Sequence, residues 1–133
     1  MAGTEASQPR NTPESATVLF DRVEALARVE GDTELLVDLI DIFFDIAVPM
    51  MEAIRAAVAT NDPVKLEKAA HRLKGSVSIF GAHTVSETAF ELEKMGRAGN
   101  LSRAADTLGQ LEQQAIYLKL SLKQFYCELR SSS

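Results

Sequence analysis

The sequence predicts an all-α domain, an antiparallel up-and-down four-helix bundle with a short extra helix at its N-terminus. Apolar residues recur at helical spacing over most of the chain, whereas the alternation typical of strands is rare. Short breaks that contain Gly, Asn or Pro separate the helical stretches and leave little freedom for anything but antiparallel neighbours. With 133 residues, 46% of them hydrophobic, the chain is long enough for one domain with its own core.

The N-terminal segment differs in composition from the rest of the chain. Residues 1–17 are rich in Ser, Thr, Pro, Glu and Ala, so we expect a disordered tail or linker there and a helical domain over residues 18–130. The segment lacks the apolar stretch of a secretory signal, and no apolar run approaches the roughly 20 residues of a membrane span. We therefore expect no membrane association and a cytoplasmic location.

The first two predicted helices are marked by their ends. Asp21 followed by Glu24 has the spacing of a capping box, and Gly31 can adopt the left-handed conformation that ends a helix. A longer helix opens at residue 32 or 33, and Pro49 should kink it rather than end it because the apolar period continues beyond. The apolar residues of this helix are Leu35, Leu36, Leu39, Ile42, Phe43, Ile46, Met50 and Ile54.

The third helix, predicted at residues 63–80, has the clearest start signal. Asn61-Asp62-Pro63 combines a capping residue with Pro at the first helical position, and Gly81 follows the last apolar residue. The apolar stripe of this helix, which should face the core, consists of Leu66, Ala70, Leu73, Val77 and Phe80.

Two further helices complete the prediction. The fourth begins near residues 82–84 and ends at the Gly-containing break at residues 96–100. The fifth runs from about residue 101 to about residue 129 with apolar residues at helical spacing.

His71 and Gly75 lie away from the core stripe of the third helix. At 100° per residue, His71 is about 140° and Gly75 about 180° from the centre of the stripe. A glycine inside a helix costs about 1 kcal/mol relative to Ala, and close packing in the core does not explain it here. A bare surface that lets another molecule reach the imidazole would explain the glycine. The alternatives are a surface histidine without function and a glycine of no consequence.

The charge around His71 differs from that of the whole chain. The net charge of −5 argues against nucleic acid as the partner. Between residues 64 and 75, however, four cations face one anion, which favours an anionic group at His71. Each of these residues alone could equally belong to an ordinary solvated helix face. They are Lys65, Glu67, Lys68, Arg72 and Lys74.

Several kinds of site are excluded by the residue inventory. The single cysteine, Cys127, rules out an internal disulfide and a multi-cysteine metal site. The two histidines are twelve positions apart, and the inward Glu-x-x-His pairs of metal-binding bundles are missing. No motif of a self-sufficient hydrolase or nucleotide-binding enzyme is present. We therefore expect a protein that binds no metal and no cofactor and is not an enzyme by itself. Any chemistry at this chain should depend on a partner protein.

The segment AAHRLKGSVSIFGA resembles the signature of histidine-containing phosphotransfer (HPt) domains, in which His, Lys and Gly keep a fixed spacing. The preceding FDRVEALARVEGDTELLVDLIDIFF resembles the first two helices of that family, and the resemblance extends over about residues 19–129. It implies an intracellular four-helix bundle that relays a phosphoryl group between aspartates of response-regulator receiver domains. The polar tail would then favour a place at the end of a hybrid sensor kinase, with a stand-alone protein as the alternative.

The resemblance also implies roles for individual residues. His71 would be the phosphoacceptor, Lys74 would stabilise the phosphoryl charge, and Gly75 would leave room for the receiver. Glu93 stands where the family places a polar residue facing the histidine, although an acid beside a phosphoryl group is less favourable than an amide. Mg²⁺ would be needed only in the receiver. The alternative function is a non-catalytic helical interaction or dimerisation module.

The helix face around His71 should also contact the partner. Apolar positions with a basic rim suit a transient interface, and we expect the domain to be a monomer. The expected partner-binding residues are Val64, Lys68, Arg72, Ser78 and Ile79. The second helix should add Met51 or Val48 to this surface.

Overall fold

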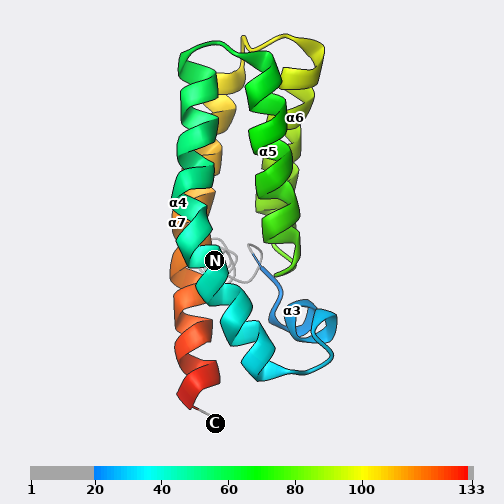
Figure 1. Ribbon diagram of the computed structural model, residues 1–133, viewed down its shortest axis with the longest axis vertical. Coiled ribbons are helices and arrows are strands. Elements are labelled where there is room, and N and C mark those ends of the chain that lie inside the picture. The colour runs from blue at the N-terminus through cyan, green and yellow to red at the C-terminus, as the bar shows by residue number, and fades with distance from the viewer. Residues whose placement is uncertain (1–19, 132–133) are drawn as a thin grey trace, which may run out of the picture.

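The computed structural model describes residues 20–131, so the tail predicted at residues 1–17 lies outside the described part. The described residues form helices joined by short loops (Figure 1). The helices are α3 (Arg22–Arg28), α4 (Thr33–Ala59), α5 (Pro63–Ser78), α6 (His83–Ala98) and α7 (Ala104–Ser131). The predicted all-α, up-and-down bundle with one short helix before it is confirmed.

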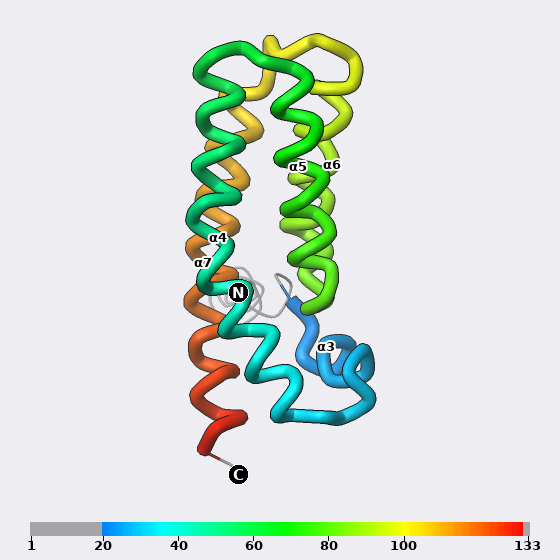
Figure 2. Tube along the Cα trace, in the orientation of Figure 1, coloured from blue at the N-terminus to red at the C-terminus, as the bar shows by residue number. Residues whose placement is uncertain are grey.

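The bundle consists of two long and two short helices. α4 and α7 have 27 and 28 residues, whereas α5 and α6 have 16 each. The long pair therefore extends beyond the short pair at one end, and α3 lies at that end, below the lower ends of α5 and α6 in the view of Figure 1. Figure 2 shows the cyan part of α4 running at an angle to the rest of the helix, and Pro49, where the kink is predicted, lies inside α4. Among residues 20–131, no helix combines the length and apolar character needed to cross a bilayer.

The connection from α4 to α5 forms as its residues predict. Asn61 adopts a left-handed conformation (φ 54°), and the Asp62 N–H closes the end of α4 by donating to the Ala57 carbonyl at 2.9 Å. The Asp62 carboxylate then accepts from the Lys65 N–H at 3.1 Å and begins α5, with Pro63 at its first position. One tight turn thus fixes where α5 begins and which of its faces meets the core.

The capping box predicted for α3 is only half formed. The Asp21 carboxylate accepts from the Glu24 N–H at 3.1 Å, as expected. The Glu24 side chain instead contacts Arg28 and, at 2.7 Å, His83 Nε2. α3 ends at Arg28, before the predicted Gly31, because the Gly31 N–H bonds back to the Leu26 carbonyl. The carboxylate of Glu24 ties α3 to the start of α6.

The core follows the predicted stripe on α5 but only part of that on α4. The five residues of the predicted stripe are at most 2% exposed, including Phe80, which lies just beyond the end of α5. On α4, however, Leu35, Ile42 and Ile46 are 43%, 53% and 37% exposed, which contradicts the expectation of one buried face. The extension of α4 beyond the short helices leaves its N-terminal half with fewer neighbours to cover it (Figure 1).

α6 ends at Ala98, within the break predicted at residues 96–100, but Gly96 itself still lies inside the helix. A Cβ atom at this position would lie 2.6 Å from the Pro63 carbonyl and 2.7 Å from the Glu67 nitrogen. The missing side chain therefore lets α6 approach the backbone of α5 closely. Gly99, with φ 73°, is the residue that ends the helix after Ala98.

Candidate functional site

His71 projects from α5 into solvent, with 68% of its side chain exposed. Its neighbours Ala70 and Leu73 are buried, which fixes the rotation of α5 and confirms the outward direction derived from the helical angle. A side chain placed rigidly on a helix in this way is well suited to react with a group carried by another molecule.

Open space adjoins His71 on the same helix. Gly75 is exposed, and a Cβ atom added there would meet no atom within 4 Å. Gly75 follows His71 by one turn and lies about 40° from it around the axis. The bare patch predicted beside the imidazole is therefore present.

A buried carboxylate holds the other side of the imidazole. Glu93 on α6 is 3% exposed, and its Oε2 lies 3.1 Å from His71 Nδ1. The same oxygen accepts from Arg97 Nη2 at 2.7 Å, while Oε1 lies 3.0 Å from Lys74 Nζ. Arg97 also reaches Glu67 on α5, with Nε 3.2 Å from Oε2. α5 and α6 are thus joined at the site by a network of alternating charges.

The surroundings of Glu93 favour its ionised form. Burial by itself would raise its pKa, but the contacts and charges of Lys74 and His71 outweigh burial, so the pKa lies below the ordinary value of 4.5. An ionised carboxylate can only accept a hydrogen bond. His71 Nδ1 must therefore carry a proton to make this contact, so that when the ring is neutral its lone pair lies on Nε2.

The ammonium group of Lys74 is less free to contact a group bound at His71 than its position one turn away suggests. Its side chain is only 28% exposed, and Nζ is paired with Glu93. The ammonium group also lies over the Phe90 ring, 4.6 Å from the ring centroid. Lys74 thus contacts the carboxylate that holds His71.

The expected partner-binding residues divide into two groups. Val64, Lys68 and Arg72 are exposed, as predicted. Ser78 is half-buried and donates its hydroxyl to the Lys74 carbonyl at 2.7 Å. Ile79 was expected to point outward but is half-buried and packs against the core at the C-terminal end of α5.

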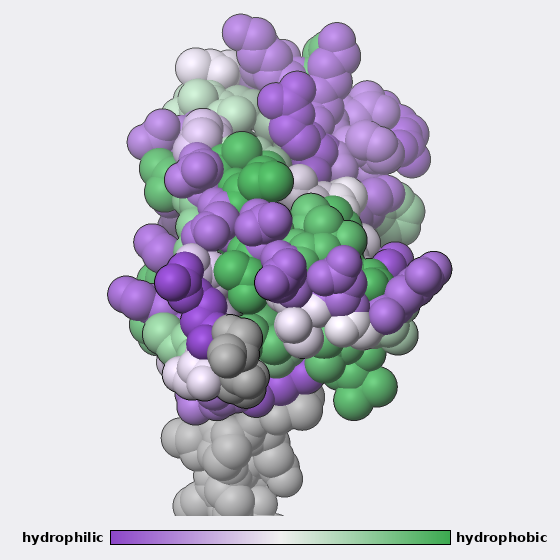
Figure 3. Space-filling view, turned by 60° about the horizontal axis from the view of Figure 1, so that its bottom comes forward, coloured by the Kyte–Doolittle hydropathy of each residue, from purple (hydrophilic) through white to green (hydrophobic). Residues whose placement is uncertain are grey.

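The residues that α4 was expected to add to the partner-binding surface were the wrong ones. Met51 is 7% exposed and buried in the core, and Val48 lines a pocket between α4 and α7. The side of α4 that faces Lys68 and Arg72 instead carries Ile46 and Pro49, which line a shared groove with them. Figure 3 shows apolar residues gathered between hydrophilic ones when the lower end of the bundle comes forward.

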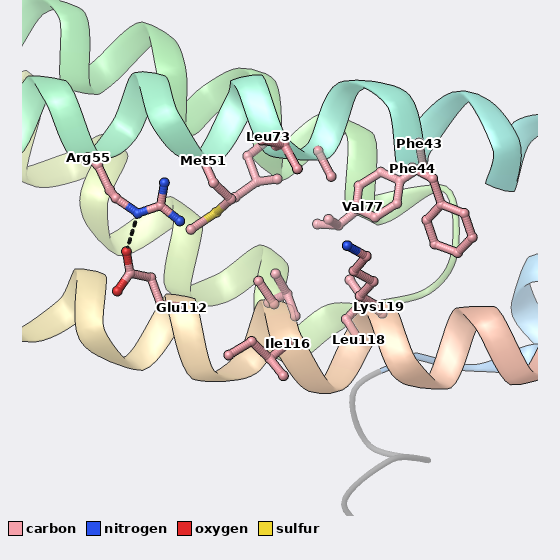
Figure 4. A pocket seen from close by; sticks show the side chains of 14 residues that line it. Phe43, Phe44, Met51, Arg55, Leu73, Val77, Glu112, Ile116, Leu118 and Lys119 are labelled. Carbon is pink, nitrogen blue, oxygen red and sulfur yellow. Dashed lines mark hydrogen bonds and ion pairs between the residues drawn. The ribbon is translucent and has the colours of Figure 1, made fainter.

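The pocket between α4 and α7 is a separate feature (Figure 4). Phe43, Met51 and Ile116 line it, and an ion pair between Arg55 and Glu112 bridges the two helices. It meets α5 through Leu73 and Val77, which lie on the face opposite His71. The pocket therefore has no access to the imidazole.

Other candidate chemistry is remote from His71. His83 lies at the start of α6, where it is 65% exposed and paired with Glu24. Within residues 20–131, no three His, Cys, Asp or Glu side chains come together as they would in a metal site.

Sequence reasoning missed Arg97 and Glu67 as members of the site. The spacing of Glu93 and Arg97, four residues apart on one helix, was a detectable signal for their pairing. The contact between Glu67 and Arg97 crosses from α5 to α6 and has no such local signal.

Comparisons with known proteins agree with this geometry. The family model of the Hpt domain matches residues 38–121. The sensor protein TorS of Escherichia coli (strain K12) is 36% identical over 62 residues, which cover 47% of this chain and 7% of TorS. The chain thus corresponds to a small part of that relative. The crystal structure of histidine-containing phosphotransfer protein B (HptB) from Pseudomonas aeruginosa PAO1 matches with a TM-score of 0.77 and 25% identity, covering 83% of this chain and 96% of that chain.

Proposed function

The chain belongs to the Hpt domain family and has a histidine phosphotransfer role in a phosphorelay, and we propose that His71 is the residue that carries the phosphoryl group. The observation that supports this most is the contact between His71 Nδ1 and the buried carboxylate of Glu93. In the neutral form of the ring, this contact keeps the proton on Nδ1 and the lone pair on Nε2, where a nucleophile requires it.

The transfer follows from this arrangement. Nε2 attacks the phosphorus of an aspartyl phosphate on a receiver domain, the N–P bond forms, and the bond from phosphorus to the aspartate oxygen breaks. The aspartate leaves as a carboxylate. The ring retains its proton at Nδ1 and becomes positively charged, and the negative charge of Glu93 stabilises it. The reverse sequence passes the phosphoryl group to a second receiver.

In the proposed reaction, most of the catalytic groups belong to the receiver and few to this chain. Phosphoryl transfer depends mainly on positioning and charge neutralisation. The receiver would supply the aspartate and Mg²⁺, while this chain, with no cofactor of its own, presents His71 rigidly on α5. Gly75 keeps the approach to the imidazole open. We place this exchange in the cytoplasm, because the family that the sequence resembles is intracellular, and we propose that the carrier acts as a monomer.

The docking surface would lie on α5 and the adjoining part of α4. Val64 is 60% exposed, and Lys68 and Arg72 form a basic edge beside Ile46 and Pro49. Such a combination of apolar contacts and basic rim fits a transient partner with an acidic active site. Nothing in the comparisons supports the alternative of a non-catalytic interaction module.

The phosphoacceptor assignment is tested by His71→Gln. The side chain is exposed, so stability should change by less than about 0.5 kcal/mol while acceptance of phosphate from a phosphorylated receiver is lost. Circular dichroism checks the fold, and acid-labile labelling measures acceptance. His83→Gln is the matched control and should be labelled like the wild type. Wild-type labelling of His71→Gln would refute the assignment.

A further inference from the structure

The orientation of the His71 ring determines which cations a bound phosphoryl group would meet. Nδ1 points toward Glu93 on α6. The two nitrogens of an imidazole point in nearly opposite directions, so Nε2 points away from α6. Around the axis of α5, Lys74 lies about 60° from His71 on the α6 side, whereas Lys68 and Arg72 lie about 60° and 100° on the opposite side. Both of the latter line the groove shared with α4, which confirms the side they occupy.

These cations also differ in whether they are already ion-paired. Lys74 is paired with Glu93 and half-buried. Lys68 and Arg72 are exposed, and neither makes an ion pair with any residue in the described range 20–131. A phosphoryl group brings about two negative charges that need cations within hydrogen-bonding reach. Lys68 precedes His71 by three residues, and a helical side chain leans toward the N-terminus, so the imidazole leans toward Lys68.

We propose that Lys68 and Arg72 contact the phosphoryl group on His71 Nε2, and that Lys74 acts through Glu93 as a positioning residue. This rests on the proposed function of His71. It departs from the role that the family resemblance implies for Lys74, because the buried carboxylate of Glu93 draws that ammonium to the Nδ1 side of the ring. The site thereby separates two tasks, with one set of charges fixing the imidazole and another meeting the phosphate.

The test measures the phosphoryl group directly on the domain after it has been loaded by a phosphorylated receiver and separated from it. The midpoint of the ³¹P titration reports nearby cations, which favour the more highly charged phosphate and lower the midpoint. The double variant Lys68→Gln/Arg72→Gln should raise this midpoint by about half a pH unit or more. Lys74→Gln should leave it nearly unchanged but shift the ¹⁵N signals of the His71 ring, because Glu93 loses a partner.

The control removes the same two charges elsewhere. Lys119 and Lys123 are exposed on α7, and Lys119→Gln/Lys123→Gln should leave the midpoint unchanged. Only the phosphorylated fraction of the domain is observed, so slower docking to the receiver does not affect the midpoint. If too little of the double variant becomes phosphorylated, Lys68→Gln and Arg72→Gln are measured separately. Each should raise the midpoint by less than the double variant. A double variant that matches this control, or a larger rise in Lys74→Gln, would overturn the proposal. Failure of wild-type His71 to become phosphorylated would instead refute the proposed function.

Discussion

At the scale of single residues, the contact between Glu93 and His71 decides which ring nitrogen can react. An acid so close to an incoming phosphoryl group looked unfavourable from the sequence, because like charges repel. The structure shows why the repulsion is limited: Lys74 and Arg97 both contact the carboxylate, so its charge is neutralised locally. A carboxylate then has an advantage over an amide, since it stabilises the positively charged phosphohistidine ring.

Glu93 should also make stability depend on pH. Its pKa is lower in the native state than the ordinary value of 4.5, so the unfolded chain binds more protons in that range. Its contribution is complete above about pH 4.5 and is lost as the pH falls through the lower native value. Glu93→Gln should therefore be less stable at pH 7 by about 1–3 kcal/mol and lose less stability on acidification.

Urea unfolding between pH 7 and pH 3 measures this difference. Glu91 on the same helix is 56% exposed in its side chain, so Glu91→Gln is the control and should follow the wild type at every pH. If the free energy of unfolding depended on pH in the same way for the wild type and Glu93→Gln, the ionised carboxylate would not be stabilised by its partners in the folded state.

The outward placement of His71 and Gly75 could be predicted because it depends only on helical periodicity within α5. The environment of the imidazole could not, since Glu93 and Arg97 come from α6 and their distances depend on how closely two helices pack. The sequence likewise did not show that Lys74 is already ion-paired. Lys74 and His71 are neighbours on α5, but the partner of Lys74, Glu93, comes from α6.

At the scale of elements, signals that involve neighbouring residues were reliable. The start of α5 at Asp62-Pro63 and the buried stripe of α5 formed as predicted. The errors arose where a helix ended or met another helix. Ile79 lies beyond the end of α5, and Gly96, the first residue of the predicted break, lies inside α6 and permits its close contact with α5.

Gly75 provides a prediction that belongs to α5 as an element. Because a side chain there would meet open space, Gly75→Ala and Gly75→Leu should each stabilise the domain by up to about 1 kcal/mol through helix propensity. Gly75→Leu should nevertheless slow transfer from a phosphorylated receiver, since its side chain occupies the space that the partner enters. Thermal unfolding and receiver-to-domain transfer rates, measured on the same preparations, check both effects.

Two comparisons separate docking from chemistry in these variants. Gly75→Ala adds only a methyl group and should slow transfer less than Gly75→Leu. A small phosphoramidate donor needs no docking surface, so labelling by it should be less affected than labelling by the receiver. Undiminished transfer from the receiver to Gly75→Leu would show that the partner does not need the open space beside His71.

At the scale of the whole molecule, the unequal helix lengths shape the docking surface. The long helix α4 exposes Ile42 and Ile46 where the short helices do not cover it, and its groove with α5 carries the apolar and basic residues near His71. The number and order of helices could be predicted from the sequence. Which α4 residues line the groove with Lys68 and Arg72 could not, because Ile46 and Pro49 lie on nearly the opposite face of α4 from Val48 and Met51, and the packing of α4 against α5 decides which face is presented.

The measurement that tests the account most directly identifies the nitrogen that carries the phosphate. The domain, with ¹⁵N-labelled histidine, is phosphorylated by a receiver and examined by ¹⁵N and ³¹P NMR. The account predicts phosphorus bonded to Nε2 of His71, with a proton retained on Nδ1 opposite Glu93. Phosphorus on Nδ1 of His71, or on His83, would contradict it.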